Sequence, residues 1–470
     1  MIEEQEDNDF RDSIGTIDKD GNRKYLFPKK TSGRFTNYRR WTSYVLLTLL
    51  VGLPFVYIDD NPFFLFNVLE RKFILFGNIF WPEDFHLAVM AMIIGVLFIV
   101  VFTVAFGRIF CGWICPQTIF MEHVFRRIEY WIEGDRNQQM RLKRMSWTGE
   151  KIRKRVLKNS IFYLISFGIS NIFMMYLISQ REWWSIVSDN PANHISSLVT
   201  IVIFSGVFFF VFAWFREQVC IIVCPYGRLQ SVLLDKHSVV IAYDYIRGEI
   251  RSKFRKNENR EEVGKGDCID CNQCVDVCPT GIDIRNGTQL ECINCTACID
   301  ACDTVMDKIN KPKGLIRFDS EENIASNKKK IFTPRVWAYS IVLGVLMIIF
   351  GFLLNSRVMV EAIVLRTPGQ LYQTISQDTL SNVYNYKLIN KTMDTLNMDI
   401  RILSPEGSLK IAGDQHISLP ESGLKEGVLL LYLHKKELTG RKTDIVLGLY
   451  QEGVLIDKIK TSFNGPIVRK

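Results

Sequence analysis

The sequence predicts an α-helical integral membrane protein with about five transmembrane helices, an inserted cytoplasmic cysteine-rich module and a C-terminal β-sandwich. Three observations support this fold class. The hydrophobic residues, 48% of the chain, gather in five long runs; all twelve cysteines fall in regularly spaced motifs; and the segment after the fifth run alternates between apolar and polar residues as strands do.

Five apolar runs approach or exceed the length that a helix needs to cross a bilayer. Ionisable residues are nearly absent from these runs, and five of them in one chain disfavour the alternative of buried helices in a soluble protein. The predicted spans are residues 41–58, 86–110, 160–179, 196–215 and 336–354.

Lysine and arginine set the predicted orientation, because they are enriched in cytoplasmic loops. Residues 1–40 carry nine and residues 111–159 carry eleven, whereas residues 60–84 carry two and residues 180–195 carry one. We therefore expect a multi-pass protein of the bacterial inner (cytoplasmic) membrane with a cytoplasmic N-terminus. The net charge of +8 reflects this topology; nucleic acid is not an expected partner, since the basic residues border apolar runs.

The acidic stretch at residues 1–9 has no apolar h-region, so we expect no cleaved signal peptide and an uncleaved first span. Residues 60–84, rich in phenylalanine and leucine but too interrupted to span, predict an interfacial helix on the outer face.

Every cysteine belongs to a motif, and on the predicted topology all twelve lie on the cytoplasmic side or at its membrane boundary. A reducing compartment disfavours structural disulfides, so the cysteines indicate metal ligation or redox chemistry. They are Cys111, Cys115, Cys220, Cys224, Cys268, Cys271, Cys274, Cys278, Cys292, Cys295, Cys298 and Cys302.

The strongest motif is C-x2-C-x2-C-x3-C-P at residues 268–279, which returns at residues 292–302 with Asp303 in place of the proline. Such runs ligate iron–sulfur clusters in bacterial ferredoxins. Residues 264–310 resemble the two-cluster ferredoxin family, within a predicted cytoplasmic module at 226–335 that includes charged linkers. A pair of zinc sites is the alternative, and the doubled three-cysteine runs disfavour it.

In two-cluster ferredoxins the fourth cysteine of each run ligates the other cluster. The predicted cofactors are therefore two [4Fe–4S] clusters that transfer electrons. The first cluster is assigned to Cys268, Cys271, Cys274 and Cys302, and the second to Cys292, Cys295, Cys298 and Cys278.

Two further motifs, CGWICP at 111–116 and CIIVCP at 220–225, each follow an apolar run. Cysteines at i and i+4 share one helical face, and Pro116 and Pro225 are expected to end the helices. If the two helical hairpins pack together, these four boundary thiols (Cys111, Cys115, Cys220 and Cys224) meet.

The boundary thiols fit several roles. They suit a soft-metal site for Cu(I) or zinc, the ligands of a further cluster, or a dithiol–disulfide couple. The remaining alternative is inert buried cysteine, which the repetition of the pair disfavours. Met121 and His123 follow the first pair; we expect them to be surface residues of a basic amphipathic segment, with a ligand role as the alternative.

The tail at 355–470 contains no cysteine and predicts a β-sandwich outside the cytoplasm that acts as an interaction module. Short alternating stretches recur at residues 382–389, 398–403, 428–433, 444–450 and 454–462. The predicted domain organisation thus has five parts. They are a cytoplasmic N-terminal segment at 1–40, a four-helix transmembrane region at 41–225, the cysteine-rich module at 226–335, a fifth span at 336–354 and the sandwich at 355–470.

Three stretches resemble the FixG/RdxA/CcoG family, accessory proteins of cbb3-type cytochrome c oxidase. They are FILFGNIFWPED at 73–84, GRIFCGWICPQTI at 107–119 and EQVCIIVCPYGRLQSVLLDKHSVVIAYDYIRGEI at 217–250. The similarity runs over nearly the whole chain. The two cysteine pairs alone also fit the wider family of polyferredoxin-like membrane quinol dehydrogenase subunits, whereas FWPED, CPYGR and YDYIRGE narrow the choice.

The resemblance implies a cupric reductase that converts Cu(II), its substrate, to Cu(I) for assembly of the oxidase, and an immunoglobulin-like C-terminal domain. The paired clusters would relay electrons from a donor that the sequence does not name. The implied partners are copper ions and oxidase assembly factors or copper chaperones. The alternative function is a quinol dehydrogenase subunit that relays electrons to a partner protein. By motif, the catalytic and copper-contacting candidates are Cys111, Cys115, Cys220 and Cys224.

Overall fold

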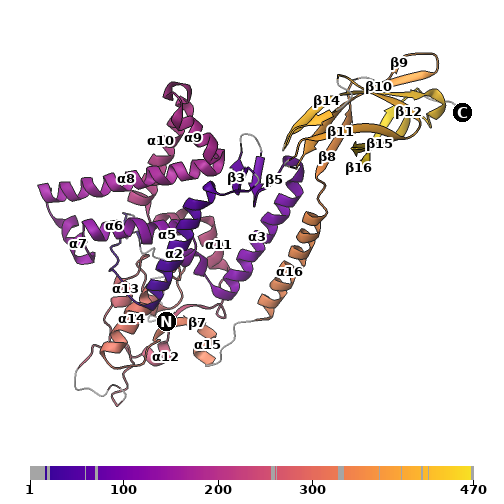
Figure 1. Ribbon diagram of the computed structural model, residues 1–470. Helices are drawn as coiled ribbons and strands as arrows, with labels where there is room; N and C mark the ends of the chain where they lie inside the picture. Colours follow the sequence, from indigo (N-terminus) through magenta and orange to yellow (C-terminus); the bar gives the residue numbers. More distant parts are fainter. Residues whose placement is uncertain are drawn as a thin grey trace. The chain divides into compact units, whose positions relative to one another are not determined.

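The structure, a computed structural model, describes residues 16–17, 22–58, 60–68, 72–255, 260, 262–326, 333–369, 371–392, 394–413, 417–421 and 423–466. The acidic stretch at 1–9 and parts of the charged linkers lie outside these residues. The chain divides into two compact units (Figure 1). One comprises Met1–Phe55 and Val89–Ile349, and the other comprises Val56–Ala88 and Phe350–Lys470.

Long apolar helices carry four of the five predicted spans. In the described part of the chain, four helices are long and apolar enough to cross a membrane. They are α3 (Phe85–Phe106), α8 (Gly149–Ile178), α10 (Ile195–Phe210) with its π-helical continuation η5 (Val211–Phe215), and α16 (Pro334–Asn355).

The first predicted span differs from its expected form. Helix α2 runs from Arg34 to Gly52, and the chain then turns through η1 (Leu53–Phe55) into a short strand. Pro54 lacks an N–H and stops the helix, while the first turns of α2 hold Arg34, Arg39 and Arg40. The apolar part, 41–52, is shorter than the ~20 residues of a spanning helix. The fifth crossing therefore remains a prediction.

Short helices contain or follow each boundary cysteine pair, and two more lie between α8 and α10. After α3 the chain forms α4 (Ile109–Trp113), α5 (Pro116–Ile119), η3 (Phe120–Phe125), α6 (Arg126–Ile132) and α7 (Arg136–Arg144) before α8. After α8 come α9 (Gln180–Ser188) and η4 (Pro191–Asn193), and after η5 come η6 (Val219–Val223) and α11 (Pro225–Leu233).

The cysteine-rich module is built on a small antiparallel ladder of β6 and β7, with Val240 opposite Asp319 and Tyr243 opposite Ile316. The two cysteine runs lie between these strands in sequence, and Ile241, Ile316 and Met306 are buried among the thiols. The elements are β6 (Val240–Tyr243), α12 (Tyr245–Gly248), α13 (Gln273–Asp276), η7 (Ile284–Asn286), α14 (Ala297–Lys308), β7 (Ile316–Asp319) and α15 (Glu321–Ser326).

The expected interfacial helix at 60–84 is wrong, because this segment forms strands. A three-stranded antiparallel sheet joins β3 (Phe64–Asn67), β4 (Lys72–Leu75) and β5 (Asn78–Phe80), preceded by the pair β1 (Tyr57–Ile58) and β2 (Asn61–Pro62). Phe76 and Gly77 both have positive φ, the conformation of a two-residue hairpin turn. The hairpin register buries Leu65, Ile74 and Ile79 on one face of the sheet. This alternation of buried and exposed positions is hard to recognise in the sequence, because the segment is rich in phenylalanine throughout.

The C-terminal segment forms the predicted β-sandwich, and all five predicted stretches are strands. One sheet has the order β12-β14-β10-β8, with β9 also paired to β10, and the other has the order β13-β11-β15-β16. Alternate residues of β10, β14 and β15 fill the core between them, among them Tyr384, Leu431 and Leu447. The strands are β8 (Val360–Arg366), β9 (Gln373–Thr374), β10 (Thr379–Asn390), β11 (Leu396–Ser404), β12 (Gly407–Ile411), β13 (Ile417–Leu419), β14 (Leu424–His434), β15 (Lys442–Gln451) and β16 (Val454–Asn464).

A buried ion pair connects the small sheet to the sandwich within the second unit. Asp84, just after the sheet, accepts hydrogen bonds from Lys391 and Arg357, each at 2.6 Å, and Lys391 also pairs with Glu361 at 2.8 Å. Burial opposes ionisation of Asp84, but the bonds from Arg357 and Lys391 outweigh it and hold the pKa of Asp84 below its usual range. This contact agrees with the predicted topology, in which both segments lie on one side of the membrane.

We expect Asp84→Asn to detach the small sheet from the sandwich. Removing one partner from a buried ion pair costs about 3 kcal/mol, at the low end of the usual range because Lys391 keeps Glu361. Amide hydrogen exchange on the detergent-solubilised chain should show residues 64–80 opening about a hundredfold more often. The exposed Asp444, on β15, provides the control substitution Asp444→Asn, which should leave the exchange unchanged. Equal protection in both variants would contradict this role.

Candidate functional site

Eight cysteines line two small cavities in the cysteine-rich module. One cavity is lined by the four cysteines assigned to the first cluster. The other is lined by the four assigned to the second cluster, together with Cys274. Each cavity therefore gathers three cysteines of one run and the fourth of the other, the donor set that a [4Fe–4S] cluster takes in two-cluster ferredoxins.

The spacing of these thiols bears on the zinc alternative. Within the described residues, no three His, Cys, Asp or Glu side chains come close enough to hold a single ion. Zinc takes all of its ligands on one ion, whereas each iron of a cubane cluster takes one thiolate. The residues thus fit a multi-iron group better than a zinc ion.

The two cysteine loops share an unusual backbone conformation. Asp270 and Asn272 in the first run, and Asn294 and Thr296 at the equivalent positions of the second, all have positive φ between 52° and 64°. Asp and Asn tolerate this left-handed region better than most residues. The two left-handed residues curl each loop inward, so that three cysteines of one run face the same cavity.

Burial favours the protonated form of several of these thiols. It raises the pKa of Cys274 and Cys292 to about 12 and that of Cys295 to about 11. Metal ligation needs the thiolate, so loading iron would release protons from these thiols.

The first boundary motif packs directly on the loop of the second cluster. A Cβ added to Gly112 would overlap the backbone carbonyl oxygen of Ile293, so a side chain cannot fit there. Beside it, Trp113 Nε1 donates to the carbonyl of Asn294 at 3.2 Å. Cys111 is buried in the same apolar cluster as Cys295. Gly112 and Trp113 therefore form the surface through which the first boundary motif contacts the loop of the second cluster.

The two boundary motifs are joined by a buried amide. Cys111 Sγ donates to Gln230 Oε1 at 3.0 Å, and Gln230 Nε2 donates to Thr103 Oγ1 at 3.0 Å. Gln230 lies on α11, directly after the second motif, and is fully buried. Sequence reasoning missed this residue, because a single glutamine in an amphipathic helix carries no distinguishing pattern.

The boundary thiols lie within electrostatic range of one another. Burial raises the pKa of Cys111 to about 11 and that of Cys220 to about 12, and the neighbouring thiols add to both shifts. Cys115 contributes to both shifts, and so does Cys224. Among the described residues, however, no three cysteines come close enough to share one ion, so the meeting of the two pairs at one site, like their roles, remains a prediction.

The helical geometry expected of each pair is only half right. Cys111 and Cys220 lie in helical turns, but Cys115 and Cys224 are the residues that precede the next helix. Pro116 and Pro225 occupy the first position of α5 and α11, where the missing N–H costs nothing. The prolines thus begin a helix as well as ending one.

A buried ion pair holds the second motif in place. Arg216 donates to both carboxylate oxygens of Glu129, at 2.7 and 2.9 Å, and Lys158 lies 3.6 Å from the same carboxylate. Burial opposes ionisation of Glu129, but Arg216 and Lys158 outweigh it and lower its pKa to about 2. Glu129 follows the first cysteine pair and Arg216 precedes the second, so this contact fixes their relative position.

Met121 and His123 differ from the expected surface residues. Met121 is 4% exposed and packs with Phe125, Phe162 and Phe212. His123 is half-buried, and burial together with Arg39 lowers its pKa to about 3. The segment turns inward because the aromatic residues of α8 and η5 cover it, a contact that local sequence does not reveal.

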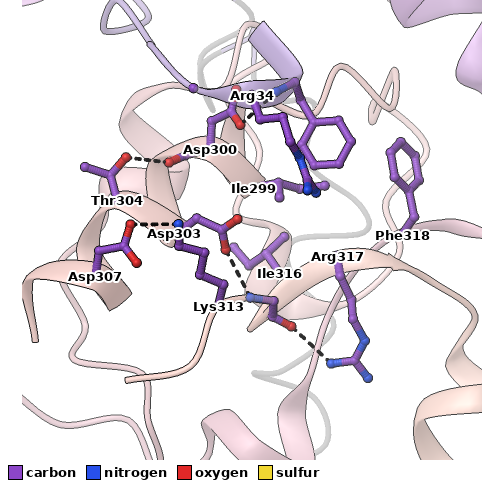
Figure 2. A pocket seen from close by; sticks show the side chains of 13 residues that line it. Arg34, Ile299, Asp300, Asp303, Thr304, Asp307, Lys313, Ile316, Arg317 and Phe318 are labelled. Carbon is purple, nitrogen blue, oxygen red and sulfur yellow. Dashed lines mark hydrogen bonds and ion pairs between the residues drawn. The ribbon is translucent and has the colours of Figure 1, made fainter. Parts of the chain in front are cut away.

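A separate cavity of about 520 Å³ lies on the other side of α14 (Figure 2). Asp303 and Asp307 line it, facing Lys313, which pairs with Asp307 at 2.9 Å. At its rim Asp300 accepts from the backbone N–H groups of Phe35 and Thr36, at 3.1 and 2.6 Å, and thus caps α2. The hydrogen bonds of Asp300 at the rim of this cavity join α2 to the module.

Family models match most of the chain. Residues 215–321 match a model described as a 4Fe-4S dicluster domain, residues 88–137 match a 4Fe-4S binding domain, and residues 350–466 match the immunoglobulin-like fold at the C-terminus of FixG. The first match includes the residues of the two thiol-lined cavities, the second covers the first boundary motif with Cys111 and Cys115, and the third covers the sandwich. Together they identify an iron–sulfur oxidoreductase. The four apolar helices make it a membrane protein.

Curated relatives cover nearly the full length. Protein RdxA of Cereibacter sphaeroides is 34% identical, over 94% of this chain and 97% of its own length. Protein RdxB of the same organism is 34% identical over 84% of this chain and 85% of its own length. The nitrogen fixation protein FixG of Rhizobium meliloti is 31% identical over 83% of this chain and 82% of its own length.

We expect Gly112→Ala to separate the first boundary motif from the loop of the second cluster. The added methyl group overlaps the Ile293 carbonyl, so the loop that carries Cys292 and Cys295 must move. Iron bound per chain, measured after anaerobic purification, should fall by about half, since one of two clusters depends on this loop. Gly95→Ala is the matched control, because nothing lies within 4 Å of its added Cβ. Full iron content in Gly112→Ala would contradict the docking role.

Proposed function

This chain belongs to the FixG and RdxA family, and we propose that it is a membrane-bound cupric reductase that supplies Cu(I) for assembly of cbb3-type cytochrome c oxidase. The observation that carries the proposal is the position of the boundary thiols. They follow the ends of two apolar helices, and Cys111 lies in the same buried cluster as the cysteines assigned to the second cluster. Soft thiolates next to an electron-transfer group suit an ion that becomes softer on reduction.

The chemistry divides between the protein and its cofactors. Bound [4Fe–4S] clusters would supply one-electron capacity between an external low-potential donor and the boundary thiols. Each Cu(II) that is reduced takes up one electron and becomes Cu(I). The thiols act as ligands and are not consumed; they release protons as they bind the ion, since burial otherwise keeps Cys111 and Cys220 protonated.

The remaining parts have supporting roles in this proposal. The cysteine-rich module and the N-terminus would face the cytoplasm, and the sandwich would face the periplasm, where it would dock oxidase assembly factors or copper chaperones. The described strands of the sandwich contain no cysteine, so it does not bring a thiol ligand of its own. The alternative function is a quinol dehydrogenase relay, in which a quinol would reduce the clusters and a partner protein would accept the electrons.

We expect replacement of all four boundary cysteines by serine to slow copper reduction at least about tenfold. Serine keeps the size of the side chain but binds Cu(I) poorly. The protein is reduced with dithionite, freed of excess reductant and mixed with Cu(II) and a Cu(I)-specific chelator. Wild type should yield about two Cu(I) per chain, one electron from each cluster.

Two controls complete this test. Protein with oxidised clusters, mixed with Cu(II) in the same way, measures the electrons that the thiols alone supply. In that reaction two thiols and two Cu(II) give one disulfide, two protons and two Cu(I). Iron content shows whether the serine variant keeps both clusters. A serine variant that holds iron and reduces copper as fast as wild type would overturn the proposal, and reduction of its clusters by a quinol would favour the alternative.

A further inference from the structure

Two buried arginines lie beside the second cluster without a carboxylate partner. Arg39 is 6% exposed and Arg108 is 4% exposed. Among the described residues, neither has an acidic side chain within ion-pair distance, and one guanidinium nitrogen of each is buried without a hydrogen-bond partner. A buried charge normally needs a counter-charge, because its desolvation costs several kcal/mol. The question is which anion serves here.

Arg108 lies between three segments of the site. It donates to the carbonyl of Leu290, two residues before Cys292, and a Cβ added to Gly227 would lie 2.9 Å from its Nη2. Cys111 is one helical turn beyond it. Its positive charge lowers the pKa of Cys111, Cys220 and Cys292 against the larger effect of burial.

Arg39 approaches the same cluster from α2. Its Nε donates to the carbonyl of Gly112 at 3.1 Å, at the point where the first boundary motif rests on Ile293. Its charge acts on Cys295 and lowers the pKa of that thiol against the effect of burial. Glu122 also acts on Cys295 in the opposite sense, but this carboxylate is paired with Arg126.

The surroundings of the first cluster have a different charge balance. Arg285 acts on Cys274, but it is paired with Asp283 at 2.6 Å and with Asp270 at 2.7 Å. Asp303 adds negative charge beside Cys302. Arg260 donates to the Cys268 carbonyl at 3.0 Å, and its remaining N–H groups are taken by the carbonyls of Ser252 and Gly266. Asp270, Asp283 and Asp303 thus offset cations on this side. On the other side, the acidic side chain that acts on Cys295, Glu122, is itself paired with Arg126.

We propose that Arg39 and Arg108 are the fixed counter-charges of the second cluster and the adjacent boundary thiols, and that they make this cluster the easier of the two to reduce. Four thiolates give a [4Fe–4S] cluster a net negative charge, which grows by one on reduction. Nearby cations in a low-dielectric site stabilise the added electron. Electrons therefore collect at the end of the relay next to the boundary thiols. This inference rests on the proposed function only for the use of those electrons.

The test is a redox titration of the full-length protein with dithionite and ferricyanide, followed by electron paramagnetic resonance. Wild type should show two separable midpoints. In Arg108→Gln and in Arg39→Gln, the ratio of reduced to oxidised second cluster at the wild-type higher midpoint should fall about tenfold, which is ~59 mV for a one-electron couple. The lower midpoint should move less. Copper is absent, so the outcome is independent of the proposed function.

Charge-conserving variants separate charge from structure. Arg108→Lys and Arg39→Lys should keep the higher midpoint within about threefold of the wild-type ratio, since they retain the positive charge. Arg285→Gln, beside the first cluster, should leave the higher midpoint unchanged because its charge is already neutralised. Equal shifts in the lysine and glutamine variants would overturn the proposal. If the glutamine variants hold no iron, the lysine variants decide, and their loss of iron would overturn it as well.

Discussion

The contact between Gly112 and the carbonyl of Ile293 is the constraint on which the rest of the site depends. It seats a membrane-boundary helix turn directly on a cluster-binding loop, with no space for a side chain between them. Trp113 and Arg39 reinforce the same junction through the Asn294 and Gly112 carbonyls. Without this junction the thiols at the membrane boundary and the thiols of the module would be two unrelated features. With it, they share one buried cluster.

The ion pairs of the protein have a consistent logic, which is to fasten segments that are distant in sequence. Arg216 and Glu129 fasten the two boundary motifs, while Lys391 and Arg357 fasten a loop between helices to the sandwich through Asp84. Such buried pairs add little net stability relative to apolar packing but are costly to break. They therefore specify position more than they stabilise, which suits a site whose function depends on the relative placement of thiols.

Much of this organisation was predictable from the sequence, because its signals are periodic or spaced. Cysteine spacing led to the two ligand sets that line the two cavities, and the long apolar runs led to four helices. Residues 60–84 were mistaken for a helix because phenylalanine is common to both structures, and α2 fell short of a clear span because Pro54 ends it. Gln230 and the burial of Met121 were out of reach, since both depend on contacts between segments more than 40 residues apart.

Arg39 and Arg108 show that a basic residue counted as a signal of membrane topology can also have a second role, here as a counter-charge. Arg39 precedes a predicted span and Arg108 ends one, so both fit the enrichment of basic residues at cytoplasmic loops. A residue that served topology alone would gain nothing from being buried, since its charge acts equally well in water at the headgroup level. Both are nevertheless buried, each with a guanidinium nitrogen left without a partner. That cost is tolerable only where negative charge compensates it. The segments that both arginines contact, at Leu290 and at Gly112, adjoin the loop whose thiolates would hold the second cluster.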